Sequence, residues 1–109
     1  MKLLFTAFLA ILLLAGCSSP QPEGSYPKVV ALNNILFGLS VEPITQNKMG
    51  NQIGVVKRLV QIMPKANEES NDAPVGSKLF EIKGIDSSEA IAVEINGKYR
   101  KAIKNGPLK

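Results

Sequence analysis

The fold is decided near the C-terminus, by the stretch AIAVEINGKYRKAI at residues 90–103. A mainly apolar stretch at 90–95 and a stretch of basic and apolar residues at 98–103 flank Asn96-Gly97, the dipeptide that most strongly favours a two-residue β-hairpin turn. A two-residue turn would place Ile91 opposite Ala102, whereas a turn one residue longer would shift the partner strand and turn its side chains to the other face. The dipeptide favours the first register and the apolar pattern favours the second, so both stay open.

Other stretches also have the pattern of β-strands. Residues 29–32 and 35–41 are mainly apolar. They flank Asn33-Asn34, a pair that tolerates the left-handed backbone of a tight hairpin turn. Residues 79–85 alternate between apolar and charged side chains, which is typical of a half-buried strand.

The middle of the chain is less regular. Pro43 ends the second apolar stretch, and residues 43–49 can form one short helical turn closed by Gly50. The stretch IGVVKRLVQIM at residues 53–63 is compatible with two structures. Its apolar positions suit a helical face, but its β-branched residues favour a strand. We favour the strand and keep the helix open, and Pro64 closes the element in both cases.

Together these elements predict a mostly β fold, or an α+β fold, for one small domain at residues 29–104. Five or six short strands would form an antiparallel sheet curled into a half-barrel, and residues 105–109 would be a C-terminal tail. The chain has 109 residues and one Cys, so no internal disulfide supports the fold.

The N-terminus has the organisation of a bacterial export signal. Lys2 precedes an apolar run from Leu3 to Ala15, which is shorter than the roughly 20 residues that a membrane-spanning helix needs. The run ends in LAGC at residues 14–17, which resembles the lipobox of bacterial lipoproteins. Small residues before Cys17 would let a peptidase approach the backbone, and the thiol can accept a diacylglycerol as a thioether. An ordinary secretory signal and an uncleaved signal anchor are the alternatives.

The lipobox resemblance implies a signal peptide at residues 1–16, cleavage between Gly16 and Cys17, and lipidation of Cys17. Residues 17–28 would then be the lipidated cysteine and a Pro-rich tether, which the prolines keep extended. Two acyl chains anchor a protein stably in a bilayer. We therefore expect a protein anchored in the cell membrane and facing outside the cytoplasm, with membrane lipid as a partner through acylated Cys17.

Composition excludes several kinds of chemistry. The chain has no His and one Cys, which excludes a His-based catalytic triad and a Cys/His metal site. A location outside the cytoplasm argues against nucleic acid as a partner. Without Lys2 the mature chain has 12 Lys and Arg against 9 Asp and Glu, and this mild basic excess indicates either contact with anionic lipid or wall polymer or no function at all. We expect no cofactor, no metal and no catalytic residue.

Two charged segments are candidates for binding. The last hairpin carries a basic run that would contact anionic lipid, an envelope polymer or an acidic patch on a membrane protein, namely Lys98, Tyr99, Arg100, Lys101 and Lys104. The alternative is an edge strand whose charges discourage aggregation. Residues 65–74, KANEESNDAP, have oxygen ligands for a hard cation, but their spacing favours a solvated acidic loop.

Several short motifs resemble those of short surface lipoproteins of Bacillus-type Gram-positive bacteria. The motifs are IGxVK at 53–57, SN at 70–71, PVGSKLFEIKG at 74–84, AIAV at 90–93 and GKY at 97–99. The resemblance covers roughly residues 50–103 and implies a Gram-positive cell surface and a strand at 53–63. It carries no catalytic residues.

We therefore expect a membrane-anchored, non-catalytic binding or interaction module. The alternative is a structural envelope component that contacts anionic lipid or wall polymer through its basic C-terminal hairpin.

Overall fold

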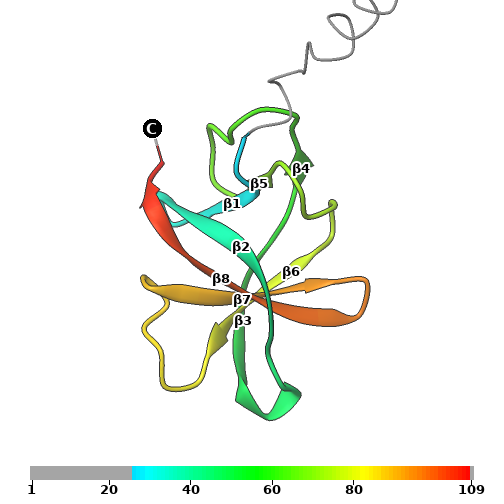
Figure 1. Ribbon diagram of the computed structural model, residues 1–109, viewed down its shortest axis with the longest axis vertical. Helices are drawn as coiled ribbons and strands as arrows, with labels where there is room; N and C mark the ends of the chain where they lie inside the picture. Colours follow the sequence, from blue (N-terminus) through cyan, green and yellow to red (C-terminus); the bar gives the residue numbers. More distant parts are fainter. Residues whose placement is uncertain (1–25, 109) are drawn as a thin grey trace, which may run out of the picture.

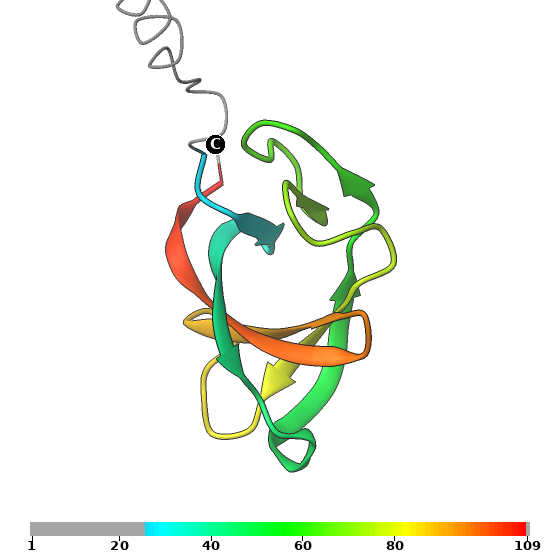
Figure 2. The ribbon, with the colours of Figure 1, turned by 45° about the vertical axis from the view of Figure 1, so that its right-hand side comes forward.

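The computed structural model describes residues 26–108, which form one sheet of eight strands curled into an open half-barrel (Figures 1 and 2). The strand order is β3-β6-β7-β8-β2-β1-β5-β4. The strands are β1 (Val29–Leu32), β2 (Ile35–Pro43), β3 (Met49–Val55), β4 (Arg58–Leu59), β5 (Glu69–Ser70), β6 (Lys78–Ile82), β7 (Ala90–Ile95) and β8 (Lys98–Pro107). The predicted fold class is confirmed. The sheet has more strands than the five or six predicted, because β4 and β5 have only two residues each and are too short to be recognised in the sequence.

The hairpin of β7 and β8 has the register of a two-residue turn, with Ile95 opposite Lys98 and Ile91 opposite Ala102. Asn96 and Gly97 have φ values of 53° and 80°, the left-handed backbone that such a turn requires. The dipeptide, rather than the apolar pattern, therefore decides the register. The hairpin of β1 and β2 turns in the same way, through Asn33 and Asn34 at φ 53° and 64°.

The segment predicted as one strand at residues 53–63 is divided. β3 pairs with β6 up to Val55, and β4 then pairs with β5, so this stretch of chain changes its partner around the buried Val56. The two ends of the strand order are thus consecutive in sequence, which curls the sheet around its apolar interior. The helical alternative is wrong, and the strand prediction is wrong beyond Leu59, where the chain enters an exposed loop.

The predicted short helical turn is a 3-10 turn, η2 (Gln46–Lys48). Gly50 does not close it but lies within β3, where a Cβ atom would come within 3.0 Å of the Glu81 Cβ and 3.2 Å of the Glu81 carbonyl oxygen. A glycine is therefore needed for the close approach of β3 to β6.

The apolar core has two parts on opposite faces of the sheet. The larger one, called the inner cluster, includes Phe37, Leu79 and Ile91. The second cluster is smaller and lies on the outer face, over Ile82 and Ala92. Because successive residues of a strand point to opposite faces, β7 contributes to both clusters and is buried along Ala90–Val93.

The predicted solvated acidic loop at residues 65–74 is wrong, because Glu68 makes structural contacts. Its amide N–H donates to the Ala31 carbonyl and its own carbonyl accepts from the Lys57 amide at 2.8 Å. Its carboxylate accepts from the Val55 N–H at 3.1 Å and lies 3.1 Å from the Lys57 Nζ. Glu68 thereby links β1 to the point where the chain leaves β3.

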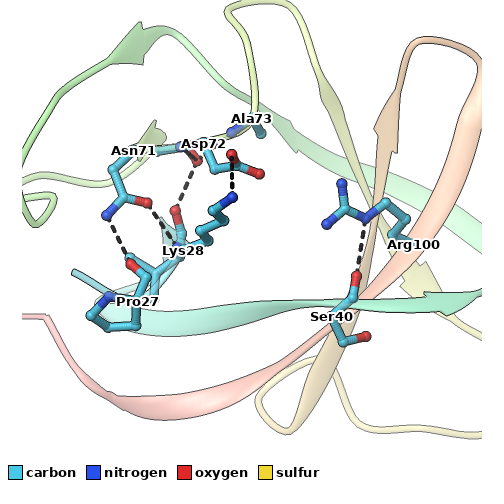
Figure 3. Close-up of polar contacts among 9 residues, drawn as sticks. Pro27, Lys28, Ser40, Asn71, Asp72, Ala73 and Arg100 are labelled. Carbon is cyan, nitrogen blue, oxygen red and sulfur yellow. Dashed lines mark hydrogen bonds and ion pairs between the residues drawn. The ribbon is translucent and has the colours of Figure 1, made fainter. Parts of the chain in front are cut away.

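Asn71 and Asp72 hold the start of the domain (Figure 3). The Asn71 carboxamide accepts from the Val29 N–H and donates to the Pro27 carbonyl, both at 2.9 Å. Asp72 lies 3.8 Å from the Lys28 Nζ. These contacts extend the folded unit back to Pro27, ahead of the expected start at residue 29.

The C-terminal boundary also differs from the expectation. Residues 105–107, predicted as tail, belong to β8, where Ile35 of β2 lies opposite Pro107. The Leu108 N–H then donates to the Asn34 carbonyl at 2.9 Å. The last strand therefore extends as far as the β1–β2 turn.

The domain has two ends of different composition. The tether end comprises residues 26–28, the 60–68 loop and the C-terminal end of β8, which lie together at the top of both ribbon views. The distal end comprises η2 and the 83–89 loop, which lie toward the bottom of both views.

Candidate functional site

The basic run of the last hairpin is divided between the two faces of the sheet. Residues directly opposite each other in neighbouring strands point to the same face. Arg100 lies opposite Val93 of the inner cluster, whereas Lys101 lies opposite Ala92 of the second cluster. Because β8 lies between β7 and β2, the edge-strand interpretation is wrong.

Two cations of the run contact a bulge in β2 between Leu39 and Pro43. The Arg100 Nε–H donates to the Ser40 carbonyl at 3.0 Å (Figure 3). The Ser40 hydroxyl donates to the Lys101 carbonyl at 2.8 Å, and the Lys101 Nζ lies 3.9 Å from a Glu42 carboxylate oxygen. The two-residue turn places Arg100 opposite the buried Val93. The hydrogen bond to the Ser40 carbonyl explains how the Arg100 side chain is accommodated there.

The remaining members of the run have different surroundings. Tyr99 is half-buried and its ring meets Phe80 edge to face, with the ring centroids 6.0 Å apart. Lys98 and Lys104 are exposed. The run predicted from the sequence is therefore not one continuous basic patch.

The distal end has a hollow of about 380 Å³, called the distal hollow here. Its apolar lining consists of Pro43, Ile44, Ile82 and Ile85. Its charged lining consists of Lys48, Lys83, Lys101 and Glu42. Three cations and one carboxylate around an apolar surface are suited to an acidic partner that also carries apolar groups.

Local backbone structure brings the parts of this hollow together. The Lys83 N–H donates to the Lys48 carbonyl at 2.9 Å, which joins the end of β6 to η2. Gly84 has φ 86°, and the Ile85 N–H closes the turn on the Ile82 carbonyl at 3.0 Å. The loop thus folds Ile85 back beside the strand it has just left.

The next turn is held by Asp86. Its carboxylate accepts from the Ser88 N–H and hydroxyl, both at 2.8 Å. These hydrogen bonds stabilise the charged form and lower the pKa of the Asp86 carboxyl. Asp86 therefore acts as a local turn residue in this loop.

A second hollow, of about 290 Å³, lies at β4 and the 60–68 loop. Its charges are paired with each other: Lys57 lies 3.1 Å from Glu68, and Arg58 lies 3.7 Å from Glu69. The Val55 N–H and the Lys57 ammonium lower the pKa of the Glu68 carboxyl. These carboxylates are engaged in holding the strands together.

A third hollow, of about 320 Å³, lies between residues 74–78 and the turn of the last hairpin. Glu94 is its one carboxylate, beside Asn96 and Gly97. Among residues 26–108 there is no group of three or more His, Cys, Asp or Glu side chains arranged to hold a metal ion.

The predicted lipidation site at Cys17 and the cleavage site at Gly16 and Cys17 lie outside the described residues. Within residues 26–108, no helix has the length and apolar character needed to cross a membrane. Comparison with known proteins finds no family model, no curated protein and no solved structure that matches the chain.

Sequence reasoning did not identify Lys48 and Lys83 as site residues. They are far apart in sequence and belong to no charged run. Only the contact between η2 and the end of β6 brings them together. A short turn after Pro43 was the sole sequence signal in this region.

Proposed function

We propose that the protein is a lipid-anchored, extracytoplasmic and non-catalytic binding module that presents its distal hollow to an acidic partner. The observation that carries this proposal is the placement of the hollow at the end of the domain opposite residues 26–28, where the tether joins. A chain held at Cys17 would therefore direct the hollow away from the bilayer.

The charge of the hollow supports an acidic partner. Lys48 and Lys83 are exposed, and among residues 26–108 neither takes part in an ion pair. The apolar lining adds contact area that a simple anion would leave unused. An acidic segment of a membrane protein, or an anionic envelope polymer with apolar substituents, meets both requirements.

Anchoring is tested by Cys17→Ala in the full chain. We expect the variant to leave the membrane fraction or to accumulate as an unprocessed precursor, because the thiol that accepts the lipid is lost. The measurement is cell fractionation followed by the mass of the N-terminal peptide. A variant that fractionates and migrates like the unmodified chain would reject the anchor.

Binding is tested with a photoreactive side chain placed at Lys83 or at Lys98 in intact cells. Both positions are exposed lysines, but only Lys83 lines the distal hollow. We expect a discrete crosslinked product from Lys83 and none from Lys98. A product from Lys98 alone would favour the envelope component that acts through its basic hairpin, and no product from either position would reject a stable partner.

A further inference from the structure

We infer that the 60–68 loop, with the adjoining Leu59, is a second contact surface, which lies against the anionic bilayer to which the chain is anchored. This inference rests on the proposed lipid anchor. Leu59 and Ile62 expose 51% and 45% of their surface, and Tyr26 exposes 45%. These are three of the six large apolar side chains exposed in residues 26–108.

The segments that carry these residues lie at one end of the domain. Residues 26–28 begin the described part of the chain, and the 60–68 loop lies beside this segment in both ribbon views. Exposed apolar side chains that gather on one surface mark a membrane or protein contact rather than ordinary surface variation. Here three of them belong to segments at the end of the domain from which the chain leads toward Cys17.

The ion pairs of this region give the surface a positive outward charge. The Arg58 side chain is 73% exposed and its partner Glu69 only 12%, while Lys57 is 69% exposed and Glu68 22%. The acids are withdrawn because they accept backbone N–H groups: Glu68 from Val55, and Glu69 from residues 65 and 66. The cations are therefore directed to the solvent, where anionic headgroups can attract them.

The length of the tether brings this surface to the bilayer. Eight residues, 18–25, separate Cys17 from Tyr26. Such a stretch can span at most about 30 Å, whatever its conformation. A lipidated Cys17 would therefore hold the tether end near the headgroups at high effective concentration, where even a weak apolar contact is occupied.

The test uses the processed, full-length lipoprotein reconstituted into phosphatidylglycerol-containing vesicles. Ile62→Cys is labelled with an environment-sensitive fluorophore, and Val41→Cys, which is exposed on the β2 bulge, is the matched control. We expect brominated lipids to quench the label at 62 about twofold or more relative to the label at 41. A label at 62 that is as accessible to an aqueous quencher as the label at 41 would overturn the inference.

Failure of the anchor and failure of the inference are distinguishable. Lipidation of Cys17 is first verified by peptide mass and by flotation with the vesicles, so an unlipidated protein rejects the anchor and the inference together. A lipidated, floating protein with an unquenched label rejects the inference alone. Shielding at 62 that depends on protein concentration but not on brominated lipid would show self-association and also reject it.

Two charge-reversal variants test whether electrostatic attraction to anionic lipid contributes to the contact. Lys65→Glu, in the exposed part of the loop, is expected to lower the quenching at 62, because it reverses a charge that faces the headgroups. Lys78→Glu, exposed on β6, is the matched control and is expected to leave the quenching unchanged. Equal effects of the two variants would contradict a local contact with anionic lipid.

Discussion

The two ends of the domain are held together in different ways. At the tether end and the adjoining β5, side chains of Glu68, Ser70 and Asn71 bind backbone groups of neighbouring strands. At the distal end, backbone contacts predominate, such as the Lys83 N–H on the Lys48 carbonyl. Two-residue strands have too few ladder hydrogen bonds to hold β4 and β5 alone, so side chains complete the structure there.

This difference also separates the surface charges. Carboxylates that serve as backbone acceptors at the tether end are withdrawn from the surface, and their cationic partners remain exposed. At the distal end the lysines surround an apolar hollow beside a single carboxylate, that of Glu42. A mild excess of basic residues in the composition thus becomes two separate positive surfaces.

The largest expected effect on stability is at the distal end. Gly50→Ala would place a Cβ 3.0 Å from the Glu81 Cβ and 3.2 Å from its carbonyl oxygen, and a backbone contact relaxes only if β3 and β6 separate. We expect a loss of about 2–3 kcal/mol in the free energy of unfolding, measured by chemical denaturation.

Gly54→Ala, near the other end of β3, is the matched comparison. Its Cβ would meet the ends of the Leu32, Glu68 and Leu79 side chains at 3.0, 3.2 and 3.3 Å, and side-chain ends relax more readily than backbone. We expect about 1 kcal/mol, and less than about 0.5 kcal/mol for Gly106→Ala, which has open space around it. A larger loss for Gly54→Ala than for Gly50→Ala would contradict the contrast between backbone and side-chain packing.

Serine substitutions sharpen the comparison. The buried Ser70 hydroxyl donates to the Val29 carbonyl at 2.8 Å and accepts from the Ala73 N–H at 2.9 Å. Ser70→Ala leaves these buried groups without that partner, and we expect a loss of about 1–2 kcal/mol. Ser88→Ala, in the exposed turn of the distal end, is expected to change stability by less than about 0.5 kcal/mol. Both variants are measured by thermal and denaturant unfolding. Equal losses of stability for Ser70→Ala and Ser88→Ala would contradict the difference between the two ends of the domain.

The smallest expected effect is on the pH dependence of stability. The Val55 N–H and Lys57 lower the pKa of Glu68 in the folded state below its ordinary value of 4.5. The stabilisation of the folded state by ionised Glu68 is therefore complete above pH 4.5, and it is lost as the pH falls through the folded-state pKa. When the denaturation midpoint is measured against pH, Glu68→Gln should therefore show a smaller fall of the midpoint at acidic pH than the unmodified chain.

Asp86→Asn is the distal counterpart of that variant. The pKa of Asp86 is also lowered, by hydrogen bonds from Ser88 within an exposed turn. We expect a smaller effect on the fall of the midpoint than for Glu68→Gln, because Asp86 joins no separate strands. If Glu68→Gln leaves the fall of the midpoint at acidic pH unchanged, the Glu68 carboxylate does not link the strands at the tether end.

Local signals predicted much of the fold. The Asn-containing turns and the end of β2 at Pro43 follow from backbone preferences of single residues. The partner change at Val55–Lys57 was missed, because only Lys57 and Arg58 interrupt a stretch of apolar and β-branched residues that resumes at Leu59 and so has the pattern of one strand. The structural role of Glu68 was missed because an acidic residue in a polar stretch has the same local pattern whether it is solvated or bound to backbone.

The sequence by itself determined the β class, the two Asn-containing turns and the prediction of a lipid anchor at Cys17, because each depends on residues adjacent in the chain. Only the tertiary structure decided which face each cation occupies, and that Lys48 and Lys83 meet around an apolar hollow. The physical reason is the curl of the sheet. It brings together residues distant in sequence through backbone pairing, which no local pattern specifies.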